Sequence, residues 1–152
     1  MKTVVKMLGT FFYLGYTPLI PGTIGSLGGL LFYLMVKYNI ALYIGSLIAL
    51  IISALLVINK AEEHFRKKDA RPIVIDEAIG MMIALLFVPQ EPVLILFAFI
   101  AFRLFDIVKP FPIRWAEGIR SPWGVLLDDI IAGIYTHLAT QAFFILAINR
   151  GA

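Results

Sequence analysis

Two pairs of adjacent acidic residues interrupt apolar stretches of this chain. Asp76-Glu77 follows the run Ile73–Ile75, and Asp128-Asp129 lies between Leu126-Leu127 and Ile130-Ile131. An ionised carboxylate beside hydrocarbon is costly unless a partner neutralises it, and four carboxylates together repel one another unless a cation binds them. Oxygen ligands without histidine or cysteine suit Mg²⁺. The two pairs therefore predict one shared Mg²⁺ site, although acids that merely begin two helices stay an open alternative.

A second charged cluster ends another apolar stretch. Arg103, Asp106 and Lys109 are spaced three residues apart, so that they share one face of a helix, and Arg114 follows them. An Arg103–Asp106 ion pair that only lets both residues remain in a membrane is the simpler interpretation. Beside a divalent ion, however, arginine and lysine are the residues that bind phosphate oxygens. Together with the acidic pairs, the cluster favours a metal-dependent enzyme that acts on a phospholipid head group.

Proline and glycine residues interrupt the first apolar stretch of the chain. We expect a helix up to about Tyr16, then a loop over Thr17–Ser26 because its two prolines break helical geometry, then a helix from about Ser26 to Tyr38. Glycines and hydroxyl groups just before a helix can bind an oxyanion through free backbone N–H groups. Taken alone, the stretch favours a simple helix start with Ser26 or Thr23 as the N-cap.

The composition points to an integral membrane protein. Hydrophobic residues make up 61% of the 152 residues, well above the ~45–50% of soluble domains. This length suits one domain that spans residues 1–152. Without cysteine there is no disulfide framework and no thiolate metal ligand. A net charge of +3 spread along the chain argues against nucleic-acid binding.

The remaining apolar stretches predict helices joined by short polar turns. The basic stretch Lys60–Arg71 belongs in the cytoplasm by the positive-inside rule, which places every candidate residue at the cytoplasmic face. We expect an all-α, membrane-embedded bundle of five crossings or near-crossings, with several short helices and an N-terminal Pro/Gly loop. A bundle half-sunk in one leaflet stays open. The expected helices and one amphipathic connection span Tyr38–Asn59, Pro72–Val88, Val93–Lys109, Ile113–Trp123 and about Trp123–Asn149.

Several short motifs occur together in this chain. They are Pro18-x-x-Pro21-Gly22-Thr23-Ile24-Gly25-Ser26, Lys68-Asp69, Ile73-Val74-Ile75-Asp76-Glu77-x-x-Gly80-Met81, Phe102-Arg103-x-x-Asp106-x-x-Lys109-Pro110-x-Pro112-Ile113 and Asp128-Asp129-x-x-Ala132-Gly133. Each motif is weak alone, but in this order, over about Gly15–Gly133, they resemble the phosphatidylglycerophosphatase A family. The resemblance implies an all-helical, Mg²⁺-dependent phosphatase of the bacterial cytoplasmic membrane. Such an enzyme converts phosphatidylglycerol phosphate to phosphatidylglycerol and inorganic phosphate.

The resemblance also implies roles for individual residues, with a phospholipid substrate held at the cytoplasmic membrane face. Whether water attacks the phosphate directly or Asp106 first forms an aspartyl-phosphate stays open, as do the number of metal ions and the oligomeric state. The implied metal ligands are Asp76, Glu77, Asp128 and Asp129, the implied catalytic residues are Arg103, Asp106 and Asp129, and the implied phosphate-binding residues are Lys109, Arg114, Thr23 and Ser26.

Two other functions fit part of the pattern. A CDP-alcohol phosphotransferase, another phospholipid head-group enzyme, is also membrane-bound and rich in aspartate, but its long Asp-Gly…Asp array does not begin at Asp76-Glu77-Ala78. A small transporter or assembly subunit with an acidic cation site would place its carboxylates near the bilayer midplane. In this chain the carboxylates lie near the ends of predicted helices, which favours chemistry at the membrane surface.

Overall fold

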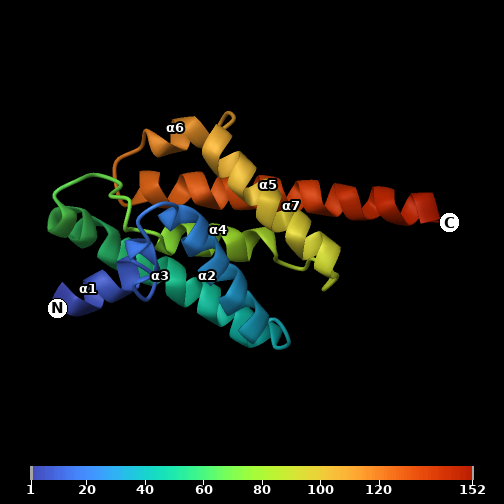
Figure 1. The fold of residues 1–152 in the computed structure, drawn as a ribbon, viewed down its shortest axis with the longest axis horizontal. Coiled ribbons are helices and arrows are strands. Elements are labelled where there is room, and N and C mark those ends of the chain that lie inside the picture. Colours follow the sequence, from blue (N-terminus) through green and yellow to red (C-terminus); the bar gives the residue numbers. More distant parts are fainter. Residues whose placement is uncertain (1, 152) are drawn as a thin grey trace.

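The computed structural model describes residues 2–151, and the side chains of residues 3–147. The described part of the chain forms helices and turns without a strand, which confirms the all-α prediction (Figure 1). The helices in chain order are α1 (Lys2–Gly9), the 3₁₀ helix η1 (Leu14–Tyr16), α2 (Pro21–Val36), α3 (Ile40–Phe65), α4 (Ile75–Ala84), α5 (Pro92–Val108), α6 (Ile113–Glu117) and α7 (Trp123–Gly151).

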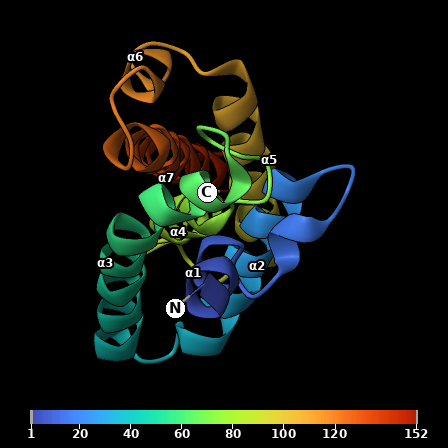
Figure 2. The same cartoon turned by 90° about the vertical axis from the view of Figure 1, so that its left-hand side faces the viewer.

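The short helix α4 lies at the centre of the bundle, where it packs against α2, α3, α5 and α7 (Figures 1 and 2). Its apolar side chains, among them Ile75, Ile79 and Met82, are fully buried. A helix of 10 residues reaches ~15 Å, about half the ~30 Å of a bilayer's hydrocarbon core. α4 is therefore the core of the bundle, and the helix predicted over Pro72–Val88 is too long at both ends.

Two glycines let α2 lie directly against α4. A Cβ on Gly25 would lie 2.6 Å from the Cβ of Val74, and a Cβ on Gly29 would lie 2.5 Å from the backbone oxygen of Ala78. The two glycines are four residues apart and so share one face of α2, as in the small-residue contacts of membrane helices. This close packing brings the first turn of α2 to the first turn of α4.

Helix α2 begins earlier than predicted, so the expected loop over Thr17–Ser26 is too long. Pro21 occupies the first helical position, where its fixed φ suits a helix and its missing N–H costs nothing. The residue at the N-cap is Ile20, and no side chain caps the helix. The prediction that Ser26 or Thr23 is the N-cap is therefore wrong. Ser26 lies inside the helix and donates a hydrogen bond to the backbone oxygen of Gly22 at 2.9 Å.

Helix α3 is longer than predicted, because it continues through the first half of the basic stretch that the sequence assigned to a loop. Asn39 caps its start by accepting a hydrogen bond from the Leu42 backbone N–H at 3.1 Å. Arg66, in the left-handed conformation at φ 53°, ends it. The observed bounds of α5 and α7 agree with the prediction to within one or two residues.

Two helices, α3 and α7, are long and apolar enough to cross a membrane. With 16 and 17 residues, α2 and α5 fall short of the ~20 residues of a full span. The structure thus supports membrane association through two long helices that have shorter helices packed beside them. Five crossings stay a prediction.

One end of the bundle, where α4 and α7 begin, also holds the start of α2 and the ends of α3 and α5. Arg103 donates to Ser26 Oγ at 3.1 Å across α5 and α2, and Lys109 donates to Asp128 at 2.7 Å across α5 and α7. Ser121 donates to Glu62 at 2.9 Å and so joins the start of α7 to the end of α3. We call this region, which faces the viewer in Figure 2, the acidic end.

Candidate metal and phosphate site

Three of the four predicted acidic ligands meet at the acidic end. The side chains of Asp76, Glu77 and Asp129 each offer a carboxylate oxygen within 4.8 Å of the other two. Asp76 is 4% exposed and Asp129 is 3% exposed. Asp76 Oδ1, Glu77 Oε2 and Asp129 Oδ1 are buried and have no hydrogen-bond partner among the described residues. Buried carboxylate oxygens without donors require a proton or a cation, so these three residues fit a metal site.

The electrostatics of α4 agree with this interpretation. Burial raises the pKa of Asp76 well above its ordinary value, and the charge of Glu77 raises it further. Burial also raises the pKa of Glu77 to about 7, although a hydrogen bond with Asp76 acts in the opposite direction. Three carboxylate oxygens in one place are hard ligands, the type that Mg²⁺ prefers.

Two glycines bring the acidic pairs together, and the sequence reasoning gave them no role. Gly80 lies four residues after Asp76, and Gly133 lies four residues after Asp129, so each lies one turn below an acid on the same helix face. A Cβ on Gly80 would lie 2.6 Å from the backbone oxygen of Asp129. A Cβ on Gly133 would lie 2.5 Å from the backbone oxygen of Gly80. Only glycine allows α4 and α7 to approach this closely.

Asp128, the fourth predicted metal ligand, is directed toward Lys109 instead. Its Oδ2 accepts from Lys109 Nζ at 2.7 Å, and its Oδ1 accepts from the backbone N–H of Asp129 at 3.0 Å. Neighbouring residues of a helix point about 100° apart, so Asp128 and Asp129 serve different partners. Lys109 also pairs with Glu117 Oε1 at 3.0 Å, a contact that the sequence did not indicate. Burial disfavours the charge of Lys109, but both carboxylates outweigh it and raise its pKa.

Arg103 is held from two sides at the edge of the three-acid cluster. Its Nη1 lies 2.8 Å from Asp106 Oδ2 and donates to Ser26 Oγ at 3.1 Å. Its Nε is buried without a hydrogen-bond partner among the described residues. Ser26 is fully buried and so supports Arg103 in the structure, while the half-buried Thr23 makes no side-chain hydrogen bond within the described chain.

Gly22, in the first turn of α2, lies directly against this part of the site. A Cβ on Gly22 would lie 2.7 Å from Glu77 Oε1 and 3.1 Å from Arg103 Nη2. The absence of a side chain therefore leaves the backbone of α2 next to both a carboxylate and a guanidinium. The Pro21-Gly22 pair was the available sequence signal, and it predicted a loop before a helix, with oxyanion binding as an alternative, but not the contact with Glu77 and Arg103.

Arg114 lies on α6, apart from the three acids. It borders an open hollow of about 510 Å³ together with Val108, Lys109, Phe111 and Trp115. Because Lys109 also contacts Asp128, this hollow adjoins the acidic end. The predicted phosphate-binding residues Lys109 and Arg114 thus line one hollow, and the predicted phosphate-binding residues Thr23 and Ser26 are not part of its lining.

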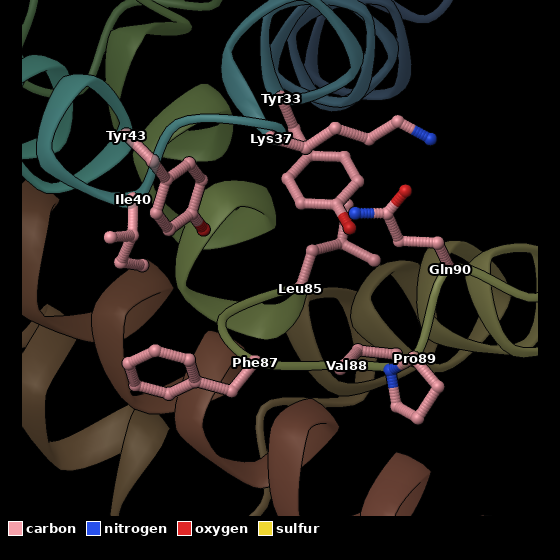
Figure 3. A pocket seen from close by; sticks show the side chains of 9 residues that line it. All are labelled: Tyr33, Lys37, Ile40, Tyr43, Leu85, Phe87, Val88, Pro89 and Gln90. Carbon is pink, nitrogen blue, oxygen red and sulfur yellow. The ribbon is translucent and has the colours of Figure 1, made fainter.

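A second hollow, of about 350 Å³, lies at the opposite end of α2 and α4 (Figure 3). Tyr33, Lys37, Tyr43 and Leu85 line part of it, and its lining contains no acidic residue. The Tyr43 hydroxyl donates to the backbone oxygen of Met82 and so ties α3 to α4. This hollow lacks the carboxylates of a metal site.

The chain matches the family model described as Phosphatidylglycerophosphatase A over residues 7–144. A protein named phosphatidylglycerophosphatase A from Escherichia coli K12 is 34% identical over 137 residues, which cover 88% of this chain and 80% of that protein. The protein of the same name from Haemophilus influenzae is 34% identical over 146 residues, which cover 91% and 87%.

A protein from Bacteroides thetaiotaomicron, provisionally named phosphatidylinositol-3-phosphatase, is 31% identical over 153 aligned residues, 95% of this chain and 92% of that protein. No solved structure matches the chain. The family match includes Gly22, both acidic pairs and the whole segment from Arg103 to Arg114. The resemblance seen in the motifs is thereby confirmed, and this chain belongs to the phosphatidylglycerophosphatase A family of phosphatases.

Proposed function

We propose that this protein is a Mg²⁺-dependent phosphatase that releases the terminal phosphate of phosphatidylglycerol phosphate at the cytoplasmic face of a bacterial membrane. The observation that carries the proposal is the group of three carboxylates, each with one buried oxygen that has no hydrogen-bond partner among the described residues. Arg103 lies beside this group, and Lys109 contacts the neighbouring Asp128. Asp76, Glu77 and Asp129 would hold the ion. Two of the relatives described above are named for this substrate.

The residues of the chain account for binding of a phosphate. A phosphomonoester carries close to two negative charges near neutral pH, and Arg103 and Lys109 supply two positive charges. Asp106 holds the Arg103 guanidinium at 2.8 Å, so the cation needs little reorganisation when a phosphate arrives. A bound Mg²⁺ would supply charge neutralisation and a water molecule of lowered pKa. Hydrolysis then breaks the bond between phosphorus and the head-group oxygen, and water provides the hydroxyl of the phosphate and the proton of the alcohol.

Phosphate release from purified protein tests the activity and the substrate together. With Mg²⁺ present, we expect release from phosphatidylglycerol phosphate in mixed micelles. Chelation with EDTA should reduce the rate to background, and added Mg²⁺ should restore it. Phosphatidylinositol 3-phosphate is the matched comparison, because one relative is named for it. Faster release from that lipid would replace the proposed substrate, and no release from either lipid would refute the phosphatase proposal for both.

The proposed cytoplasmic location rests on the basic residues near the acidic end. Arg66, Lys67 and Lys68 follow α3 directly, and Lys68 Nζ donates to the backbone oxygen of Ile119 at 3.5 Å, beside the start of α7. Such clusters are retained in the cytoplasm. Because the chain has no cysteine, single cysteines can report sidedness in intact cells. A membrane-impermeant thiol reagent should spare Lys67→Cys and label Gln90→Cys, and the reverse pattern would invert the topology.

A further inference from the structure

The corner between α5 and α6 combines exposed apolar side chains with a cation next to the site. Phe111 is 82% exposed and Trp115 is 66% exposed, and Ile107 and Val108 are exposed beside them. Large side chains of this kind are rarely left in water as one contiguous patch. Tryptophan in particular is enriched where a protein meets the head groups of a membrane. The patch therefore suits contact with lipid.

Arg114 lies at the same corner, and no carboxylate of the described residues pairs with its guanidinium group. It forms no ion pair with an acid of the described chain, and its one hydrogen bond runs from Nη2 to the Val108 backbone oxygen at 3.5 Å, the limit of such a contact. Lys109, on the same hollow, is by contrast held by Asp128 and Glu117. Of the two cations that border the hollow, Arg114 is therefore the one whose charge is not paired with a carboxylate of the described residues.

The substrates named for the relatives have two phosphates of different kinds. A phosphatidyl group contains a phosphodiester that links diacylglycerol to the head group, and the added phosphate is a monoester on that head group. A few carbon and oxygen atoms separate the two phosphates in either lipid. The hollow offers groups that match these parts of the lipid. Lys109 contacts Asp128 of the acidic pair, Arg114 borders the same hollow, and the apolar side chains of Phe111 and Trp115 are exposed at its edge.

We propose that the α5–α6 corner is the lipid-facing wall of the site, where Arg114 binds the phosphodiester of the substrate and where Phe111 and Trp115 contact its glycerol and first acyl carbons. A guanidinium group can donate two parallel hydrogen bonds to two oxygens of one phosphate, and a phosphodiester has two such free oxygens. This inference rests on the proposed function, because a phosphomonoester without a lipid part would not need the wall. Recognition of the phosphodiester by Arg114 would also explain how one scaffold could accept lipids with different head groups, since every such lipid contains this diester.

Binding of the product lipid tests the wall without requiring turnover. Phosphatidylglycerol contains the diester but no monoester, so it cannot be hydrolysed in the proposed reaction. The chain has two tryptophans, and a Trp123→Phe background leaves Trp115 as the only one. We expect phosphatidylglycerol with bromines near the carboxyl end of its acyl chains to quench Trp115 fluorescence in detergent-purified protein. Adding Arg114→Gln should raise the lipid concentration required for half-quenching roughly tenfold.

Two controls separate this site from general attraction between the protein and lipids. Brominated diacylglycerol has the chains but no phosphate, so its quenching should be the same with and without Arg114→Gln. Arg120→Gln removes an exposed arginine that does not border the hollow, and it should leave phosphatidylglycerol quenching unchanged. Equal quenching with and without Arg114→Gln, or an equal loss in Arg120→Gln, would overturn the proposal. Arg114-dependent binding in a protein that releases no phosphate would refute the phosphatase alone.

Discussion

Asp129→Asn is expected to remove divalent-ion binding and to lower the rate of phosphate release at least about 100-fold. Substitution of a residue that only hydrogen-bonds to a metal ligand typically lowers metal affinity or activity ~10–100-fold. The loss of a metal ligand itself should therefore have a larger effect. The substitution keeps the size of the side chain and removes one negative charge from a cluster whose oxygens lie within 4.8 Å of one another. Mn²⁺, observed by electron paramagnetic resonance, is a suitable probe of binding that does not depend on turnover.

The neighbouring residue supplies a matched control. Asp128→Asn removes the same charge one position earlier, but in the structure this carboxylate holds Lys109 at 2.7 Å. Mn²⁺ affinity should therefore stay close to that of the unmodified protein. Weaker placement of Lys109 should raise the KM for the phospholipid roughly tenfold, as expected for the loss of one hydrogen bond to a charged group. Equal loss of Mn²⁺ in both variants would instead support a site with all four acids as ligands.

The contrast between these two residues shows where sequence reasoning stops. Both are aspartates in one apolar stretch, and their charge alone predicted that each needs a partner. Which partner each finds depends on how α7 is rotated against α4, and that rotation is set by the contact of Gly80 with Gly133. A single sequence shows the glycines but not the crossing point. The sequence therefore predicted that residues of the two acidic pairs lie together, but it did not predict that Asp129 joins Asp76 and Glu77 while Asp128 contacts Lys109.

For a related reason, the sequence did not reveal that α4 forms the core of the bundle. Its residues are as apolar as those of α3 and α7, so hydropathy predicted another crossing or near-crossing. The residues of α4 are apolar because they pack against the other helices that surround α4 on several sides. Length is the feature that distinguishes the two cases, and the true length depends on the turns at both ends. Helix ends are the least certain part of a prediction from propensity.

The second large effect that we expect follows from the helix contact. Gly80→Ala should lower the free energy of unfolding by about 1–3 kcal/mol, as overpacking of a tight core does, and should reduce turnover roughly 100-fold. The new Cβ would lie 2.6 Å from the backbone oxygen of Asp129 and 2.7 Å from the ring of Phe102. Backbone atoms cannot rotate out of the way, so α4 and α7 must separate. Thermal unfolding in detergent, Mn²⁺ binding and phosphate release would measure the three consequences.

Gly45→Ala is the control for the general effect of adding a methyl group to a helical glycine. Gly45 is exposed within α3, and a Cβ there would meet nothing within 4 Å. Alanine should therefore leave turnover unchanged and stabilise the helix by up to ~1 kcal/mol. Gly133→Ala, whose Cβ would lie 2.5 Å from the backbone oxygen of Gly80, should reproduce the losses of Gly80→Ala. If both variants at the crossing bound Mn²⁺ and turned over normally, the acidic pairs would not depend on this contact, and the site would have to form by another arrangement of α4 and α7.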